Sequence, residues 1–347
     1  MVKGGLGSNL PCTETESKHS MSQQSPSKPK ATSNRPARYR KAVMFCCDQN
    51  YLPFAAHAAA QVHALHESRD FDICFCFGTQ EIEVPDSLDY LEIRTCQIDV
   101  GAAFDGLRLD KGKTHDVYLR LALPDAFSEE YDRILYLDSD IFVQGGDFSA
   151  LLDMDMGDHA LAAVRDNVQW RTANRQKKRN TLPGLEPAAY FNAGVALMNI
   201  AVCTESDLLG HCVRFGRTHA KDLTRHDQNL LNAYFNGNWA ELSPMWNWQF
   251  SWAARLFATL YSPNIVHFIG SVKPWKDPLG ELEPRFANSM RRFSHRHFPE
   301  FTFDKVPRGH LTPDSQRMTR MLFKHLMSRR KMARYLARFP TDLTVYK

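Results

Sequence analysis

Two aspartates that interrupt a strongly apolar segment are the residues of this sequence best suited to chemistry. Asp138 and Asp140 lie between the runs Ile-Leu-Tyr-Leu (134–137) and Ile-Phe-Val (141–143). These runs predict a buried strand, and alternate residues of a strand share one face. Buried carboxylates need a partner, and a divalent cation that bridges a diphosphate could use both. The alternative is an exposed Asp-Ser-Asp turn, which would not require such uniformly apolar flanks.

A histidine near the end of a later apolar run could complete this site. His267 lies in Asn-Ile-Val-His-Phe (264–268) and is followed by Gly270 and Lys273. An imidazole is a common ligand of divalent cations, glycine lets the backbone approach a phosphate, and an ammonium neutralises phosphate charge. A buried histidine with a purely structural hydrogen bond is the alternative reading of His267.

The segments that must position these residues alternate between strand and helix patterns. Helices are expected at 54–66 and at 115–123, where Pro124 would end the second one. This alternation predicts an α/β fold with a mixed, mainly parallel sheet and helices on both faces. Ligands of such sheets gather at the carboxyl ends of the strands. The expected strands are 41–47, 71–77, 91–98, 133–137, 160–164, 191–200 and 265–269.

Composition divides the chain into three regions. Residues 1–39 are rich in Ser, Pro, Lys, Thr and Gln, which predicts a disordered leader. Residues 40–285 form the expected catalytic domain. Residues 286–347 are expected to form a C-terminal basic helical region. Within it, 317–339 carries eight Lys or Arg and no acid, with an apolar half on a helical wheel.

This basic, amphipathic helix has two explanations. It could lie on an anionic membrane surface. Alternatively, it could dock on the acidic middle of its own chain. The two ends (1–40 and 317–347) together carry a net charge of +13, which leaves −9 for residues 41–316 out of a total of +4. We favour the membrane surface because the absence of acids is unusual for simple docking.

The same charge distribution and the cysteines exclude other classes of protein. A nucleic-acid-binding protein would carry its basic surface on the folded domain, so we expect no nucleic-acid partner. The cysteines, such as Cys46 and Cys47, lack the spacing of a zinc or redox motif and are expected to be reduced. No apolar run is long enough to span a bilayer. We therefore expect the chain in the cytoplasm, with peripheral attachment to the inner face of the cytoplasmic membrane.

A basic segment over 170–185 lacks periodicity and is expected to be a loop. It could fold over a substrate, although a solvated surface loop explains it as well.

Five motifs in a fixed order resemble glycosyltransferase family 8, particularly its bacterial lipopolysaccharide glucosyl- and galactosyltransferases. The resemblance covers roughly residues 41–280, and the ordered set is more specific than any single motif. Gln49 and Cys47 depart from residues common in the family, an acid and Ala. The motifs are Asp48-x-Asn50-Tyr51, Leu135-Tyr-Leu-Asp-Ser-Asp-Ile, Phe191-Asn-Ala-Gly-Val, His226-Asp-Gln-Asn and His267-x-x-Gly-x-x-Lys-Pro-Trp.

This resemblance implies a GT-A type, Rossmann-like fold, a UDP-glucose or UDP-galactose donor and Mn²⁺, with Mg²⁺ as the alternative ion. It implies metal ligation by Asp138, Asp140 and His267. The implied donor contacts are Cys46, Asp48, Asn50, Tyr51, Arg120, Asp138, Ser139, Asp140, Gly270 and Lys273. The implied contacts to the donor sugar or acceptor are Asp166, Asn192, Asp227 and Gln228.

The family also implies transfer with retention of anomeric configuration onto a glycan or glycolipid, for which lipopolysaccharide core is the best candidate. Gln228 is our candidate beside the anomeric centre. Because its amide is a poor nucleophile, a short-lived ion pair is favoured over a covalent intermediate. Two alternatives remain. One is a glycogenin-like transferase that modifies a protein or itself, and the other is a noncatalytic protein that binds UDP-sugars.

Overall fold

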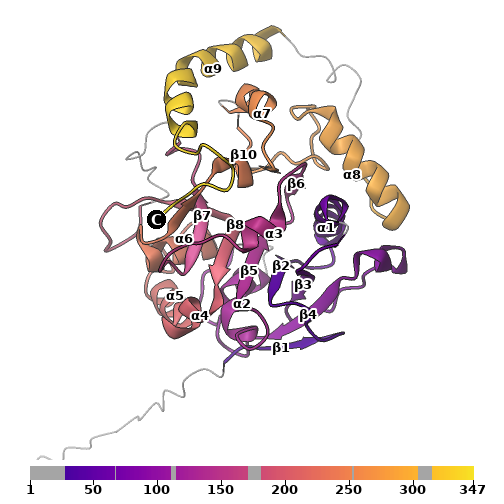
Figure 1. Cartoon of the computed structure of the whole chain (residues 1–347), viewed down its shortest axis with the longest axis vertical. Coiled ribbons are helices and arrows are strands. Elements are labelled where there is room, and N and C mark those ends of the chain that lie inside the picture. Colours follow the sequence, from indigo (N-terminus) through magenta and orange to yellow (C-terminus); the bar gives the residue numbers. More distant parts are fainter. Residues whose placement is uncertain (1–27, 67, 111–114, 171–180, 252–253, 304–314) are drawn as a thin grey trace, which may run out of the picture.

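A mixed sheet with helices on both faces forms the centre of the computed structural model, which describes residues 28–347 except 67, 111–114, 171–180, 252–253 and 304–314 (Figure 1). The strand order is β1-β4-β3-β2-β5-β8-β7-β9-β12, and a second sheet has the order β10-β11-β6. The predicted α/β architecture is confirmed. The strands are β1 Lys30–Ser33, β2 Lys41–Cys46, β3 Asp72–Phe77, β4 Arg94–Asp99, β5 Arg133–Leu137, β6 Ile141–Val143, β7 Leu161–Arg165, β8 Phe191–Asn199, β9 Ala240–Leu242, β10 Trp248–Gln249, β11 Ile265–His267 and β12 Val345–Tyr346.

The apolar strands bury both faces of the sheet, which explains their unbroken hydrophobic runs. In β2, Val43 and Phe45 pack in one core, whereas Ala42 and Met44 pack in the other. The first core is covered by α1 (Leu52–Leu65), α3 (Phe148–Leu152) and α8 (Pro284–His297). The second is covered by α2 (Leu119–Ala126), α4 (Ile200–Glu205), α5 (Leu208–Thr218) and α6 (His226–Phe235).

The direction of β8 brings distant parts of the sequence to one edge of the sheet. Strands β4, β3, β2 and β5 are parallel, but β8 is antiparallel to both β5 and β7. The start of β8 therefore lies beside the carboxyl end of β7, where Asn192 pairs with Val164. The polar residues that follow β5 and β7 and those that begin β8 thus share an edge.

The predicted disorder of residues 1–39 is wrong for Lys30–Ser33. These residues form β1, which pairs antiparallel with β4 at the edge of the sheet. Their low apolar content does not prevent this, because an edge strand gains main-chain hydrogen bonds and its side chains alternate between exposed and half-buried. Residues 1–27 lie outside the described part of the chain.

The C-terminal region does not stand apart from the catalytic domain. The expected boundary after residue 285 falls inside α8, and β12 adds to the main sheet beside β9. Helix α9 (Ser315–Leu336) docks through its last turns, where Tyr335 donates a 2.7 Å hydrogen bond to Glu241 of β9. Glu241 also binds Arg165 and Arg338. The docking explanation is therefore right for this end of the helix.

The predicted end of the second helix at Pro124 is wrong. Pro124 lies inside α2 instead of ending it. Proline lacks a backbone N–H donor, yet the helix continues to Ala126. The Phe127 N–H closes it by donating to the Leu123 carbonyl at 3.1 Å. Most of the basic segment, 171–180, falls outside the described residues. Among the helices that are described, none is both long and apolar enough to cross a bilayer.

Candidate functional site

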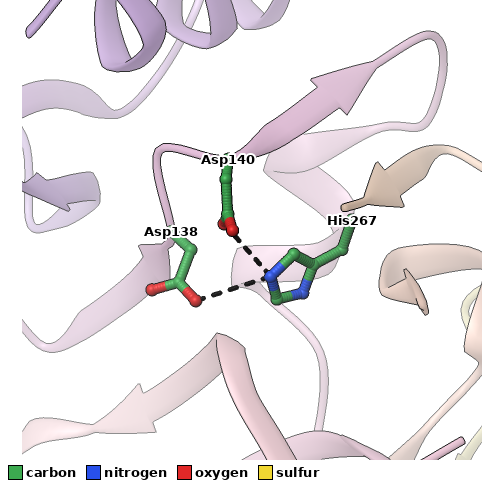
Figure 2. A group of neighbouring side chains, drawn as sticks. All are labelled: Asp138, Asp140 and His267. Carbon is green, nitrogen blue, oxygen red and sulfur yellow. Dashed lines mark ion pairs between the residues drawn. The ribbon is translucent and has the colours of Figure 1, made fainter. Parts of the chain in front are cut away.

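Asp138, Asp140 and His267 lie together at the carboxyl edge of the sheet. Asp138 and Asp140 occupy the short link between β5 and β6, and the buried Ser139 separates them. His267 is the last residue of β11, which pairs with β6 so that His267 faces Ile141. Figure 2 shows both carboxylates directed at the same imidazole nitrogen. The predicted convergence of these three side chains is confirmed.

The distances fit a single divalent cation. One ligand atom from each residue lies within 4.8 Å of the other two. The Nε2 atom of His267 is 3.1 Å from Asp140 Oδ1 and 3.6 Å from Asp138 Oδ2. Two hard carboxylate oxygens and an imidazole suit ions such as Mn²⁺. In the described part of the chain, no other group of His, Cys, Asp and Glu meets this criterion.

Gly194 of β8 passes so close to this cluster that no larger residue fits. A Cβ atom there would lie 2.6 Å from Asp138 Oδ2 and closer still to the His267 ring. The Gly194 carbonyl also accepts a 2.8 Å hydrogen bond from the Asp138 N–H. The glycine of Phe191-Asn-Ala-Gly is therefore required by close approach.

Lys273 brings positive charge to the other side of Asp140. Its ammonium forms an ion pair with Asp140 Oδ2 and donates to the Phe268 carbonyl. Burial acts to raise the pKa of the Asp140 carboxyl, but His267 and Lys273 outweigh it and lower that pKa strongly. Gly270, between His267 and Lys273, has a φ of +118° and open space around its Cα. This loop can therefore present both backbone and ammonium to an anion.

Arg120 of α2 joins the cluster to the start of α6. Its guanidinium donates to Asp138 Oδ1 at 2.8 Å and lies 2.6 Å from Asp227 Oδ2. Tyr136 also donates to Asp138 Oδ1, at 2.8 Å, and its ring lies under the guanidinium. Burial is the main cause that raises the pKa of Asp227 to about 6, and the charge of Asp138 adds to it. Asp227 is therefore a buried acid beside the Asp138, Asp140 and His267 cluster.

Gln228 and Asn192 contact each other across α6 and β8. The Asn192 amide donates to Gln228 Oε1 at 3.2 Å, and the Ala193 N–H donates to the same oxygen at 3.3 Å. The Gln228 amide in turn donates to the Tyr190 hydroxyl at 3.3 Å. The side chain of Gln228 is thus held in one orientation at this edge.

Asp166 is held by partners outside the carboxylate cluster. It follows β7 and accepts a 3.1 Å hydrogen bond from Arg225, whose guanidinium lies near the Tyr190 ring. Since Tyr190 contacts Gln228, Asp166 connects to the site through Arg225 and Tyr190.

The residues expected to bind the nucleotide lie at the end of β2 and in the turn into α1. Cys46 and Asp48 are half-buried, whereas Asn50 and Tyr51 are exposed. The Asp48 carboxylate already makes one hydrogen bond within the turn, because it accepts from the Tyr51 N–H at 2.9 Å. Burial raises the pKa of the Tyr51 hydroxyl, and the nearby Asp140 carboxylate raises it further. This turn therefore borders the metal cluster.

Sequence reasoning missed four residues of this site: Tyr136, Tyr190, Arg225 and Asn247. Tyr136 was assigned only to a strand, although it precedes Asp138 by two residues and so shares its face. Asn247 accepts from or donates to the Nδ1 atom of His267 at 3.0 Å and is fully buried. In the sequence, Asn247 stands out only as an amide between two tryptophans, and this pattern does not indicate which residue it contacts.

The comparisons with known proteins agree with this geometry. The family model "Glycosyl transferase family 8" matches residues 42–278. General stress protein A of Bacillus subtilis (strain 168) is 28% identical over 268 residues, which cover 67% of this chain and 86% of that protein. The lipopolysaccharide 1,3-galactosyltransferase of Salmonella typhimurium is 30% identical over 174 residues, 48% of this chain and 50% of that protein.

A solved structure shares the fold. The galactosyltransferase LgtC, solved with donor and acceptor sugar analogs, superposes with a TM-score of 0.58 at 23% identity, over 77% of this chain and 98% of LgtC. At that identity the likeness speaks for the GT-A fold alone. The family model, in contrast, spans most of the chain and contains every element that carries the site. The chain therefore belongs to glycosyl transferase family 8.

Proposed function

We propose that this glycosyltransferase is a metal-dependent, retaining enzyme that transfers glucose or galactose from a UDP-sugar to a glycan, with lipopolysaccharide core as the acceptor. The observation that carries the proposal is the Asp138, Asp140 and His267 cluster, with Lys273 beside it. A divalent cation held there would supply positive charge to the diphosphate of the departing UDP. The acceptor is taken from the lipopolysaccharide transferases to which the chain is similar.

The chain's own residues would share the remaining work. The Lys273 ammonium, which now contacts Asp140, would donate to a phosphate oxygen and stabilise charge as the UDP leaves. Asp48, Asn50 and Tyr51 would bind the uracil and ribose. The Gln228 amide, held by Asn192 and the Ala193 N–H, would lie beside the anomeric carbon. No strong base is required for departure of UDP, which suits the ion-pair route to retention.

The test measures UDP release from UDP-glucose and from UDP-galactose, with Mn²⁺ and with a chelator, in the presence of lipopolysaccharide core. We expect turnover with one of the two sugars, and only with the metal. Metal-independent turnover would refute the proposal. Calorimetry with UDP and Mn²⁺ separates the alternatives: tight binding without release favours a noncatalytic protein. Mass spectrometry that finds hexose on a tyrosine of the chain favours the glycogenin-like transferase.

We further propose that residues 318–327 of α9 attach the protein to an anionic membrane surface. Exposed apolar side chains of this segment include Phe323 (62%) and Met327 (69%). Helix α7 (Arg255–Tyr261) packs against α9, and its Leu260 is a further exposed apolar side chain. Helices α7, α8 and α9 occupy the end of the molecule away from β1 (Figure 1). The charge supports this partner, because the described side chains of α9 include many cations and no acid.

Substitution of two exposed apolar residues tests this attachment. Phe323→Ser with Leu326→Ser should weaken binding of the full chain to phosphatidylglycerol vesicles at least about tenfold, since both side chains lose apolar burial in the bilayer. UDP release should not change. Leu65→Ser with Leu109→Ser, two exposed leucines elsewhere, is the matched control. Equal sedimentation of all three proteins with the vesicles would contradict the proposal.

A further inference from the structure

A buried amide connects the metal ligand His267 to Gln228. Asn247 lies between Trp246 and Trp248, and none of its surface is exposed. Its Oδ1 atom is 3.0 Å from His267 Nδ1, and its Nδ2 atom donates to Asn192 Oδ1 at 2.8 Å. Asn192 in turn donates to Gln228 Oε1. Three amides thus form one hydrogen-bonded chain from the imidazole to α6.

The backbone of β8 sets the direction of this chain. The Gly194 N–H donates to Asn192 Oδ1 at 3.1 Å, and the Ala193 N–H donates to Gln228 Oε1 at 3.3 Å. A backbone N–H is always a donor, so both contacted atoms must be oxygens. The Asn192 nitrogen therefore points at Gln228, and its oxygen faces Asn247.

The orientation of Asn247 follows from this. If its amide were reversed, two oxygens would face each other at 2.8 Å without a proton between them. Its nitrogen must therefore face Asn192, which leaves its oxygen for His267. An oxygen at 3.0 Å requires that the Nδ1 atom of His267 carries the proton.

This tautomer leaves the lone pair on the other ring nitrogen. In the neutral imidazole, a proton on Nδ1 means that Nε2 is the free base. Nε2 is the atom that faces Asp138 and Asp140, at 3.6 Å and 3.1 Å. With the Nδ1–H held by Asn247, Nε2 is the nitrogen left to bind a cation between the two carboxylates. Metal-binding histidines commonly donate their second N–H to such a partner, and loss of the partner costs about 10- to 100-fold in affinity.

We propose that Asn247 is a positioning residue that fixes the Nδ1–H tautomer of His267 and, through Asn192, orients the amide of Gln228. This rests on the proposed function, because it assigns His267 to the cation and Gln228 to the sugar. It makes two separable demands on Asn247. The oxygen serves the cation site, and the nitrogen serves Gln228.

Two variants of the full chain separate these demands. Asn247→Leu removes both contacts, so Mn²⁺ affinity, measured by EPR without nucleotide, should fall about 10- to 100-fold. Asn247→Asp keeps an acceptor for the His267 N–H but places a second oxygen against Asn192 Oδ1. It should therefore keep Mn²⁺ affinity within about threefold of the parent, in contrast to the loss expected on losing the partner. Its kcat should fall with little change in KM.

Nitrogen-15 NMR of the metal-free, histidine-labelled protein supplies a readout that does not depend on turnover. His267, assigned by comparison with His267→Gln, should carry a proton on Nδ1 in the parent and in Asn247→Asp, and should populate the Nε2–H tautomer in Asn247→Leu. Asn264→Leu is the matched control. It removes a 2.8 Å amide hydrogen bond to Asp342, which is not part of the series Asn247, Asn192 and Gln228. It should lower the melting temperature and leave Mn²⁺ affinity unchanged.

The outcomes distinguish this inference from the proposed function. An Nε2–H tautomer in the parent, or full Mn²⁺ affinity in Asn247→Leu, overturns the role of Asn247 at the cation site. Full kcat in Asn247→Asp overturns its role toward Gln228. If the parent shows no turnover with either UDP-sugar, the proposed function fails, whereas the EPR and NMR results still decide the tautomer.

Discussion

Replacement of Asp140 by asparagine is expected to reduce metal-dependent UDP release and Mn²⁺ affinity by at least about 100-fold. Loss of a residue that merely supports a metal ligand already costs about 10- to 100-fold, and Asp140 is itself a proposed ligand. The change is nearly isosteric, but it removes a negative charge that faces both His267 and Lys273. Steady-state UDP release and EPR titration with Mn²⁺ measure the two effects.

The control for this prediction is Asp89→Asn, which removes an exposed carboxylate elsewhere on the surface. It should match the parent in both assays. If Asp140→Asn binds Mn²⁺ as tightly as the parent, Asp140 is not a ligand. If it binds Mn²⁺ weakly but releases UDP at the parental rate, the cation is not needed for transfer.

The strand that precedes Asp138 and Asp140 could be predicted from the sequence because the pattern is local. Apolar residues on both sides of two acids leave few alternatives to a strand that ends in a ligand site. The helix of Arg120 and the start of β8 were predicted in the same way. Their convergence with His267 depends on sheet order. The local pattern left His267 either a third ligand or a structural residue, and only the resemblance to a family favoured the ligand.

Other features could not be predicted because their stability comes from partners far along the chain. Strand β12 has two residues and exists only because β9 offers an edge. Residues 30–33 resemble the rest of the polar leader in composition, yet β4 pairs with them. The role of Asn247 depends on which atoms face it, and residue type does not encode this. The burial of α9 also depends on a distant partner. Glu241 binds Tyr335 near the end of the helix, whereas Phe323 and Met327 are exposed.

The site also concentrates charges in a way that a protein selected for stability alone would avoid. The half-buried Asp138 and the buried Asp227 lie on either side of Arg120 and share its single positive charge. Burial raises the pKa of Asp227 despite Arg120, and the negative charge of Asp138 raises it further. A buried acid that is retained despite this cost is a candidate for function.

Replacement of Asp227 by asparagine is therefore expected to reduce UDP release by about 100-fold or more, a loss typical of one essential polar group in an active site. The same variant should gain stability relative to the parent as the pH rises. Asp227 has a pKa of about 6 in the folded chain and an ordinary value of 3.8, so the folded state binds the proton more tightly. The free energy of unfolding of the parent must then fall between these pH values, a decrease that the variant lacks.

Denaturant unfolding of both proteins at pH 4.5 and at pH 7.5 measures this linkage. The difference in free energy of unfolding should shift by about 2 kcal/mol in favour of Asp227→Asn over that interval. Asp89→Asn should show no such shift. If the difference in free energy of unfolding is the same at both pH values, the pKa of Asp227 is not raised in the folded chain. If Asp227→Asn releases UDP at the parental rate, Asp227 has no role in the reaction. Both expected results together would show that the chain keeps this acid for transfer at the expense of its own stability.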